Sequence, residues 1–125
     1  MTINSRDKGA VGERELANFL KERGIDARRG QQFSGGNDSP DVVVPWPDVH
    51  LEVKRTEKFR LYDAVDQARR DSSGTGKVPL VVHRCNNDRR LGSCRGEWLV
   101  VVSLDDFLVL KQKADAMTAI LGEMV

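Results

Sequence analysis

The sequence predicts an α/β fold, with residues 1–125 forming one domain in which helices flank a central mixed β-sheet. Three observations predict it. Apolar residues at helical spacing mark both ends of the chain, and short apolar strands lie between them. A further helical segment interrupts the strands, which gives the order αβββαββα. A chain of this length fits one domain that buries about two-thirds of its unfolded surface.

The first expected element is a helix over residues 9–23, where Gly24 offers a C-terminal stop. Glu13 lies three residues before Leu16 and seven before Leu20, so it sits on or beside the apolar stripe. That is an unusual place for a carboxylate, and it makes Glu13 a candidate site residue. The alternative is a first-turn Glu that complements the helix dipole.

A β-hairpin is the next prediction, after a first strand over residues 25–29 and a glycine-rich loop over 30–40. One arm is residues 40–44, the turn is residues 45–48, and the second arm runs to Lys54.

This hairpin places Asp41 opposite Glu52, with Cβ atoms about 5 Å apart. Strand alternation then directs Asp41, Glu52 and Lys54 to one face of the sheet. Two carboxylates and an amine on one face are costly unless they bind a cation or do chemistry. The opposite face receives four apolar residues, Val42, Val44, Leu51 and Val53.

The second half of the chain continues the alternation of helix and strand. The expected elements are a helix over 60–71, a connection over 72–77, a buried strand over 78–83, an exposed loop over 84–96 and a strand over 97–102. Ser103 and Asp106 resemble a capping box, with Asp in place of Glu, for a short helix over 104–110. The tail over 113–121 has a helical pattern of its own.

Charge is unevenly distributed, although the formal net charge is only +1. Residues 37–53 carry four acids and no Lys or Arg, whereas residues 54–70 carry six bases and three acids. An acidic strip beside basic segments suits a metal-dependent enzyme that acts on a polyanion. An ordinary mixed surface is the alternative.

The N-terminus lacks the apolar stretch of a signal peptide, and no apolar run is long enough to span a bilayer. We therefore expect a cytoplasmic protein without a membrane partner, in which Cys85 and Cys94 are free thiols. Together with His83, these cysteines supply at most three of the four ligands of a structural zinc site.

The acidic strip offers the parts that phosphodiester hydrolysis needs. Asp41, Glu52 and the backbone carbonyl of Val53 are hard oxygen ligands of the kind that suit Mg²⁺. Lys54 would orient or help to deprotonate the attacking water, or offset charge on the phosphate. Glu13 would reach the same cation or its water. The alternative is a surface salt bridge between Lys54 and either acid.

Polar and basic residues around this strip are candidates to contact a phosphate or its water. Gln67 lies beside the apolar stripe of the helix over 60–71. Arginines flanking the strip would clamp phosphates bidentately, and the glycine-rich loop would let backbone amides approach a phosphate. A solvated charged face is the alternative. The candidate DNA contacts are Lys8, Arg14, Arg28, Arg29, Ser34, Arg55, Arg69 and Arg70.

The ordered set of a helix Glu, an Asp, a Glu-x-Lys and a helix Gln resembles the PD-(D/E)xK nuclease superfamily. More closely, the chain resembles archaeal and phage-type Holliday junction resolvases over roughly residues 8–110. The loop over 30–40 is longer than in the archaeal proteins, and segment 84–96 also departs from their pattern. The segments that carry the resemblance are Gly12-Glu13-Arg14, Pro40-Asp41, Glu52-Val53-Lys54 and Gln67-Ala68-Arg69-Arg70.

This resemblance implies a restriction-endonuclease-like fold and a Mg²⁺-dependent endonuclease, with Mn²⁺ able to substitute. It implies a homodimer that cuts four-way DNA junctions by paired nicks. Asp41 and Glu52 would ligate the metal, Glu13 would support it or its water, and Lys54 would assist that water. Arg14, Arg29 and, more loosely, Ser34 match positions that contact DNA.

Two other functions stay open at this stage. One is a nuclease of the same superfamily that acts on forks, flaps or duplex DNA, and the other is a catalytically inactive DNA-binding module. The apolar residues Leu104, Phe107, Leu108 and Leu110 are candidates for a dimer interface, with core packing as the alternative.

Overall fold

The structure, a computed structural model, describes residues 5–30, 40–55, 60–84 and 96–123, with the backbone alone for residues 5–8. Its elements are α1 (Ser5–Lys21), β1 (Arg28–Arg29), β2 (Val42–Val43), β3 (Val49–Lys54), α2 (Leu61–Ser72), β4 (Val78–His83), β5 (Leu99–Val101) and α3 (Leu104–Glu123). The predicted αβββαββα order is confirmed.

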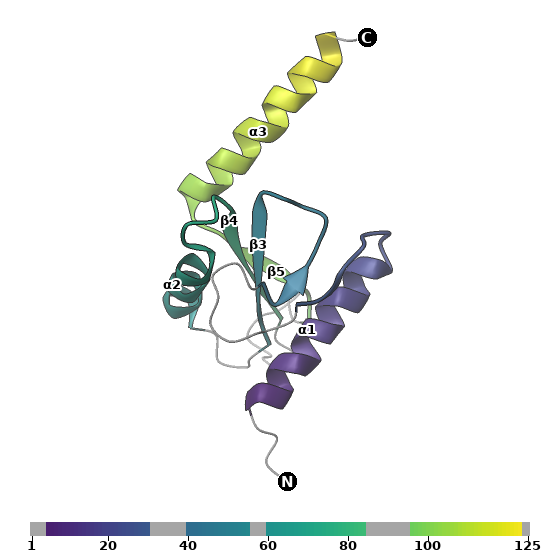
Figure 1. The fold of residues 1–125 in the computed structure, drawn as a ribbon, viewed down its shortest axis with the longest axis vertical. Helices are drawn as coiled ribbons and strands as arrows, with labels where there is room; N and C mark the ends of the chain where they lie inside the picture. The colour runs from purple at the N-terminus through teal and green to yellow at the C-terminus, as the bar shows by residue number, and fades with distance from the viewer. Residues whose placement is uncertain (1–4, 31–39, 56–59, 85–95, 124–125) are drawn as a thin grey trace.

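The strands form one five-stranded sheet in the order β1-β2-β3-β4-β5. Strands β3 and β4 are parallel, with α2 as the crossover between them, and every other neighbouring pair is antiparallel. The predicted mixed sheet is therefore confirmed. Figure 1 shows α1 and α2 on either side of this sheet.

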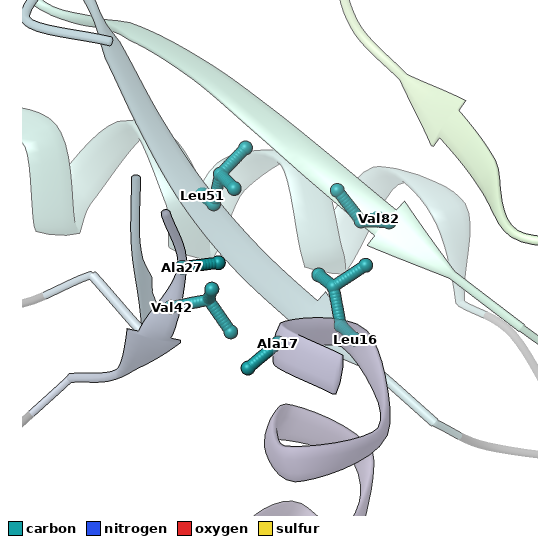
Figure 2. Packing of buried hydrophobic residues seen from close by; sticks show 6 residues of the cluster. All are labelled: Leu16, Ala17, Ala27, Val42, Leu51 and Val82. Atoms are coloured by element: carbon teal, nitrogen blue, oxygen red, sulfur yellow. The ribbon is translucent and has the colours of Figure 1, made fainter. Parts of the chain in front are cut away.

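The core lies mainly between the sheet and α1. Leu16 and Ala17 of α1 pack against Val42, Leu51 and Val82, as Figure 2 shows. On the other side, α2 packs Ala64 and Ala68 onto Val81. Since Val81 and Val82 are consecutive on β4, the two helices cover opposite faces of the sheet.

The predicted pairing of Val42 with Leu51 is confirmed. The Asp41 N–H donates to the same Leu51 carbonyl at 3.0 Å, so Asp41 lies against Leu51 and does not form the predicted ladder pair with Glu52. The backbone just after β1 packs closely against the start of β2. The Gly30 N–H donates to the Asp41 carbonyl at 2.8 Å, and a Cβ on residue 30 would lie 1.9 Å from the Pro40 carbonyl oxygen. Only glycine permits this close approach of the two backbones.

The C-terminal region differs from the prediction, because the two expected helices over 104–110 and 113–121 are one continuous helix, α3. Lys111, Gln112 and Lys113 interrupt the apolar pattern, but all three are good helix formers. The predicted cap is present, since the Ser103 hydroxyl accepts the Asp106 N–H at 3.1 Å.

Smaller differences lie at element ends, which sequence patterns define least well. Helix α1 begins at Ser5 rather than residue 9, and β1 is shorter than the strand expected over 25–29. Helix α3 projects away from the body of the protein (Figure 1). None of the helices in the described part of the chain has the length and apolarity needed to cross a membrane.

Candidate active site

The candidate site lies where β2 begins beside the C-terminal part of β3. Asp41 and Glu52 are only 9% and 2% exposed, although both are acids. The Asp41 N–H donates to the Leu51 carbonyl at 3.0 Å, and Asp41 Oδ2 accepts the Val53 N–H at 2.9 Å. Asp41 is thus fixed to β3 by both its backbone and its side chain.

The Val53 carbonyl belongs to the same edge of β3. In an antiparallel ladder, the N–H and C=O of one residue point to the same neighbouring strand. Since the Val53 N–H points to Asp41, its carbonyl also faces the β2 side of β3. Oxygen atoms from Asp41 and Val53 therefore lie along one strand edge, and Glu52 directly precedes Val53 on β3.

Glu52 is surrounded by polar side chains from three elements. His50 Nε2 lies 2.9 Å from Glu52 Oε1, and the His50 side chain is fully buried. Burial, the charge of Asp41, and hydrogen bonds with Asp71 and Asp41 raise the pKa of Glu52 to about 10. In the absence of a cation, this carboxyl group therefore holds a proton at neutral pH.

Glu13 brings α1 into the site. Its pKa is raised by burial and by the charge of Asp41, and the Arg29 guanidinium opposes this shift from 3.3 Å. Helix α1 reaches this position because Gly12 has no side chain. A Cβ at residue 12 would lie 2.6 Å from the Cβ of Arg55, just beyond β3.

Lys54 and Gln67 meet on the α2 side of the sheet. Lys54 Nζ donates to Gln67 Oε1 at 2.6 Å. Strand alternation places Lys54 on the same face as Glu52 and His50. Gln67 thus fixes the Lys54 amine on this face of the sheet, a contact that sequence reasoning did not foresee for it.

The described basic residues fall into two groups. Arg14, Arg28, Arg69 and Arg70 are exposed and can meet a phosphate directly. Arg55, by contrast, is part of an internal network: its Nε lies 3.4 Å from Glu15, which also accepts Arg84 Nη1 at 2.8 Å. Arg29 is intermediate between the two groups, with a 42% exposed side chain that contacts Glu13. The Lys8 side chain and Ser34 lie outside the described residues, as do Cys85 and Cys94.

Sequence reasoning missed two residues that touch Glu52, namely His50 and Asp71. Strand alternation could have identified His50. The same pattern that places Glu52 and Lys54 on one face of β3 also places His50 there, two residues before Glu52. Asp71 follows Gln67 by four residues on α2, so helical spacing places them on one face.

The acids fit a divalent cation with a mainly aqueous coordination shell. Among the described residues, no group of three His, Cys, Asp or Glu side chains forms a ready metal cluster. Mg²⁺ is usually bound through one or two carboxylates and keeps several waters. Two carboxylates beside a backbone carbonyl match that donor set.

Comparison with known proteins gives a match to a family model and matches to solved structures. The family model described as archaeal Holliday junction resolvase (Hjc) matches residues 4–71, more than half of the chain. A solved structure of Hjc from Archaeoglobus fulgidus, a Holliday junction resolvase from an archaeal hyperthermophile, has a TM-score of 0.50 and 24% identity. The match covers 76% of this chain and 72% of the Archaeoglobus chain. No curated protein matches the sequence.

Proposed function

Because the chain belongs to the archaeal Holliday junction resolvase family, of the PD-(D/E)xK type, we propose that it is a Mg²⁺-dependent endonuclease that resolves four-way DNA junctions. The observation that carries this proposal is the buried Asp41–Glu52 pair, with Lys54 two residues further along the strand. Every residue that we place in the site lies within residues 4–71.

The metal is supported by the protonation of the site. A buried glutamic acid with a pKa near 10 is unfavourable for a structural residue, but a divalent cation would replace its proton. Asp41, Glu52 and the Val53 carbonyl would hold Mg²⁺, with Glu13 acting through a water. When bound, the ion supplies a more acidic water and neutralises charge on the phosphate.

The chain's own residues would orient the reaction. The Val53 N–H fixes the Asp41 carboxylate, and His50 fixes one oxygen of Glu52. Gln67 holds the Lys54 amine, so that this amine can position the attacking water or stabilise charge on the scissile phosphate. The exposed arginines would bind neighbouring phosphates and hold the DNA in register.

We further propose that the active form is a homodimer. A four-way junction has two-fold symmetry when its opposed strands are cut, and a two-fold dimer presents two identical sites to those strands. Paired nicks then follow from the symmetry of the enzyme and not from a second kind of site.

The test is cleavage of labelled DNA by the full chain, comparing a four-way junction with a linear duplex, a fork and a flap. We expect paired, symmetric nicks in the junction with Mg²⁺ or Mn²⁺, and none with EDTA. Glu52→Gln should abolish them, whereas the exposed control Glu22→Gln should cleave normally.

Two results would overturn the proposal in different ways. Equal cutting of forks, flaps or duplex would leave a nuclease but remove the junction specificity. Tight junction binding without cleavage in any metal would identify a DNA-binding module instead.

A further inference from the structure

Helix α3 exposes apolar side chains along its whole length. Leu104, Met117 and Leu121 are 71%, 55% and 56% exposed, and no residue of the helix is buried. The helix meets the body near its start, where it touches β4, and through a Lys113–Asp48 ion pair at 3.9 Å. An exposed apolar helix of this length indicates a surface that another molecule covers.

The apolar residues include one regular stripe. Its members alternate in steps of three and four residues, which is the spacing of the a and d positions of a coiled coil. They span most of a helix about 30 Å long. We call this set the α3 seam: Phe107, Leu110, Ala114, Met117 and Leu121.

The charges beside the α3 seam favour a second copy of the same helix in parallel orientation. With Phe107 at an a position, Asp106 is at g and Lys111 at the following e. In a parallel pair, each g residue faces the e residue five positions further along the other helix. Asp106 of each copy would therefore face Lys111 of the other, which gives two attractive pairs.

The same charges disfavour DNA as the occupant. Helix α3 carries four acids, Asp105, Asp106, Asp115 and Glu123, and two bases, Lys111 and Lys113. The acids outnumber the bases, so the helix has a formal charge of −2, and its Lys113 pairs with Asp48 of the body. A net negative helix repels a phosphate backbone.

We propose that α3 docks a second copy of this chain, seam to seam, as a parallel two-stranded coiled coil. The role of this coiled coil rests on the proposed function. Parallel helices place both nuclease bodies at the same end of the dimer, where the two active sites can reach one junction. The proposed coiled coil concerns this chain specifically, since α3 lies outside the residues that the family model matches.

The first test is the mass of the full chain in solution without DNA, measured by sedimentation equilibrium. The wild type should be dimeric at micromolar concentration. Met117→Glu puts a charge in the α3 seam and should weaken the dimer by about a hundredfold or more. Ala116→Glu is the matched control, because residue 116 lies on the opposite side of the helix and should leave the dimer intact.

Orientation is tested by cross-linking in a Cys85→Ser, Cys94→Ser background. In a parallel seam, residue 114 faces its own equivalent, so Ala114→Cys should form a disulfide between copies on oxidation. Ala116→Cys should not. A wild type that stays monomeric, or a dimer insensitive to Met117→Glu, would overturn the inference, and an intact dimer without the Ala114→Cys disulfide would overturn the parallel seam.

Circular dichroism should show that Met117→Glu keeps its helical content, so that lost dimerisation is not lost folding. Measuring both the oligomeric state and DNA cleavage distinguishes failure of the α3 seam from failure of the proposed nuclease. A dimer that cleaves no DNA supports the α3 seam and contradicts the nuclease. A monomer that cleaves junctions supports the nuclease and contradicts the α3 seam.

Discussion

The acidic site and helix α3 depart from the usual distribution of polar and apolar side chains in opposite directions. Between β2, β3 and α2, the acids Asp41 and Glu52 are almost fully buried. Along α3, by contrast, large apolar residues such as Met117 and Leu121 are more than half exposed. Buried acids and exposed apolar patches are the two distributions that carry information about function.

Each region has an unfavourable arrangement of side chains that a different partner would relieve. Glu52 keeps a proton beside Asp41 when no cation is bound, and in the proposed function Mg²⁺ would replace that proton. An apolar stripe in water needs another apolar surface, and the α3 seam therefore calls for a second helix. Each region should respond to its own partner and not to the other's.

Removal of one acid should give the largest effect and separate the two regions most clearly. We expect Asp41→Asn to lower junction cleavage by roughly a thousandfold or more, because it removes several kcal/mol of charge stabilisation. Single-turnover rates at saturating enzyme measure this. The variant should remain dimeric. A monomeric Asp41→Asn variant would show that the acidic site and the α3 seam are not independent.

Loss of the Gln67 contact should have a smaller effect on the same site. Gln67→Ala frees the Lys54 amine, and we expect a 10- to 100-fold lower cleavage rate, of the order seen when a supporting residue is lost. Gln67→Glu keeps an acceptor for Lys54 and should lose less activity. Equal rates for both variants would show that the contact does not matter.

The stability of the metal-free protein should reveal the unfavourable burial of Glu52. Its pKa is about 10 in the folded state against an ordinary 4.5, so the folded state keeps a proton that the unfolded chain releases. The free energy of unfolding should therefore fall as pH rises between those values.

Glu52→Gln removes that dependence. At pH 8 without metal, we expect it to be more stable than the wild type by roughly 1–3 kcal/mol, as measured by urea denaturation. Mg²⁺ should stabilise the wild type alone. A less stable Glu52→Gln would mean that Glu52 supports the fold rather than a ligand.

His50 distinguishes support of the fold from orientation of Glu52. His50→Leu removes the 2.9 Å contact with Glu52 and should cost roughly 1–3 kcal/mol of unfolding free energy. His50→Gln can still donate to that carboxylate, so it should recover part of the loss and bind Mg²⁺ more tightly than His50→Leu does. Equal metal affinities would remove any orienting role.

The exposed arginines should give the smallest effect. Arg28→Gln should weaken junction binding only a few-fold and reduce the slope of log affinity against log salt by about one. Fluorescence anisotropy over a series of salt concentrations measures both. Arg55→Gln should instead lower stability, because Arg55 contacts Glu15 inside the fold.

How far the sequence predicts the structure differs between these regions. Alternation predicts the hairpin, because shifting Val42 and Leu51 by one residue would bury the wrong side chains. It cannot reveal that Gln67 and Asp71 reach the strand, since that depends on how α2 packs over the parallel β3–β4 pair. The pattern does not predict that α3 is continuous, because the polar residues 111–113 separate two apolar segments and so suggest two helices.

The proposed metal site is tested most directly by calorimetric titration of Mg²⁺ into the metal-free protein, in two buffers with different ionisation enthalpies. We predict one ion per chain and release of about one proton at pH 7, because the ion displaces the proton on Glu52. Glu52→Gln should bind far more weakly and release no proton, and Met117→Glu should bind as the wild type does. Binding that is unchanged in Glu52→Gln, or that releases no proton in the wild type, would contradict the assignment of the buried acids as the metal site.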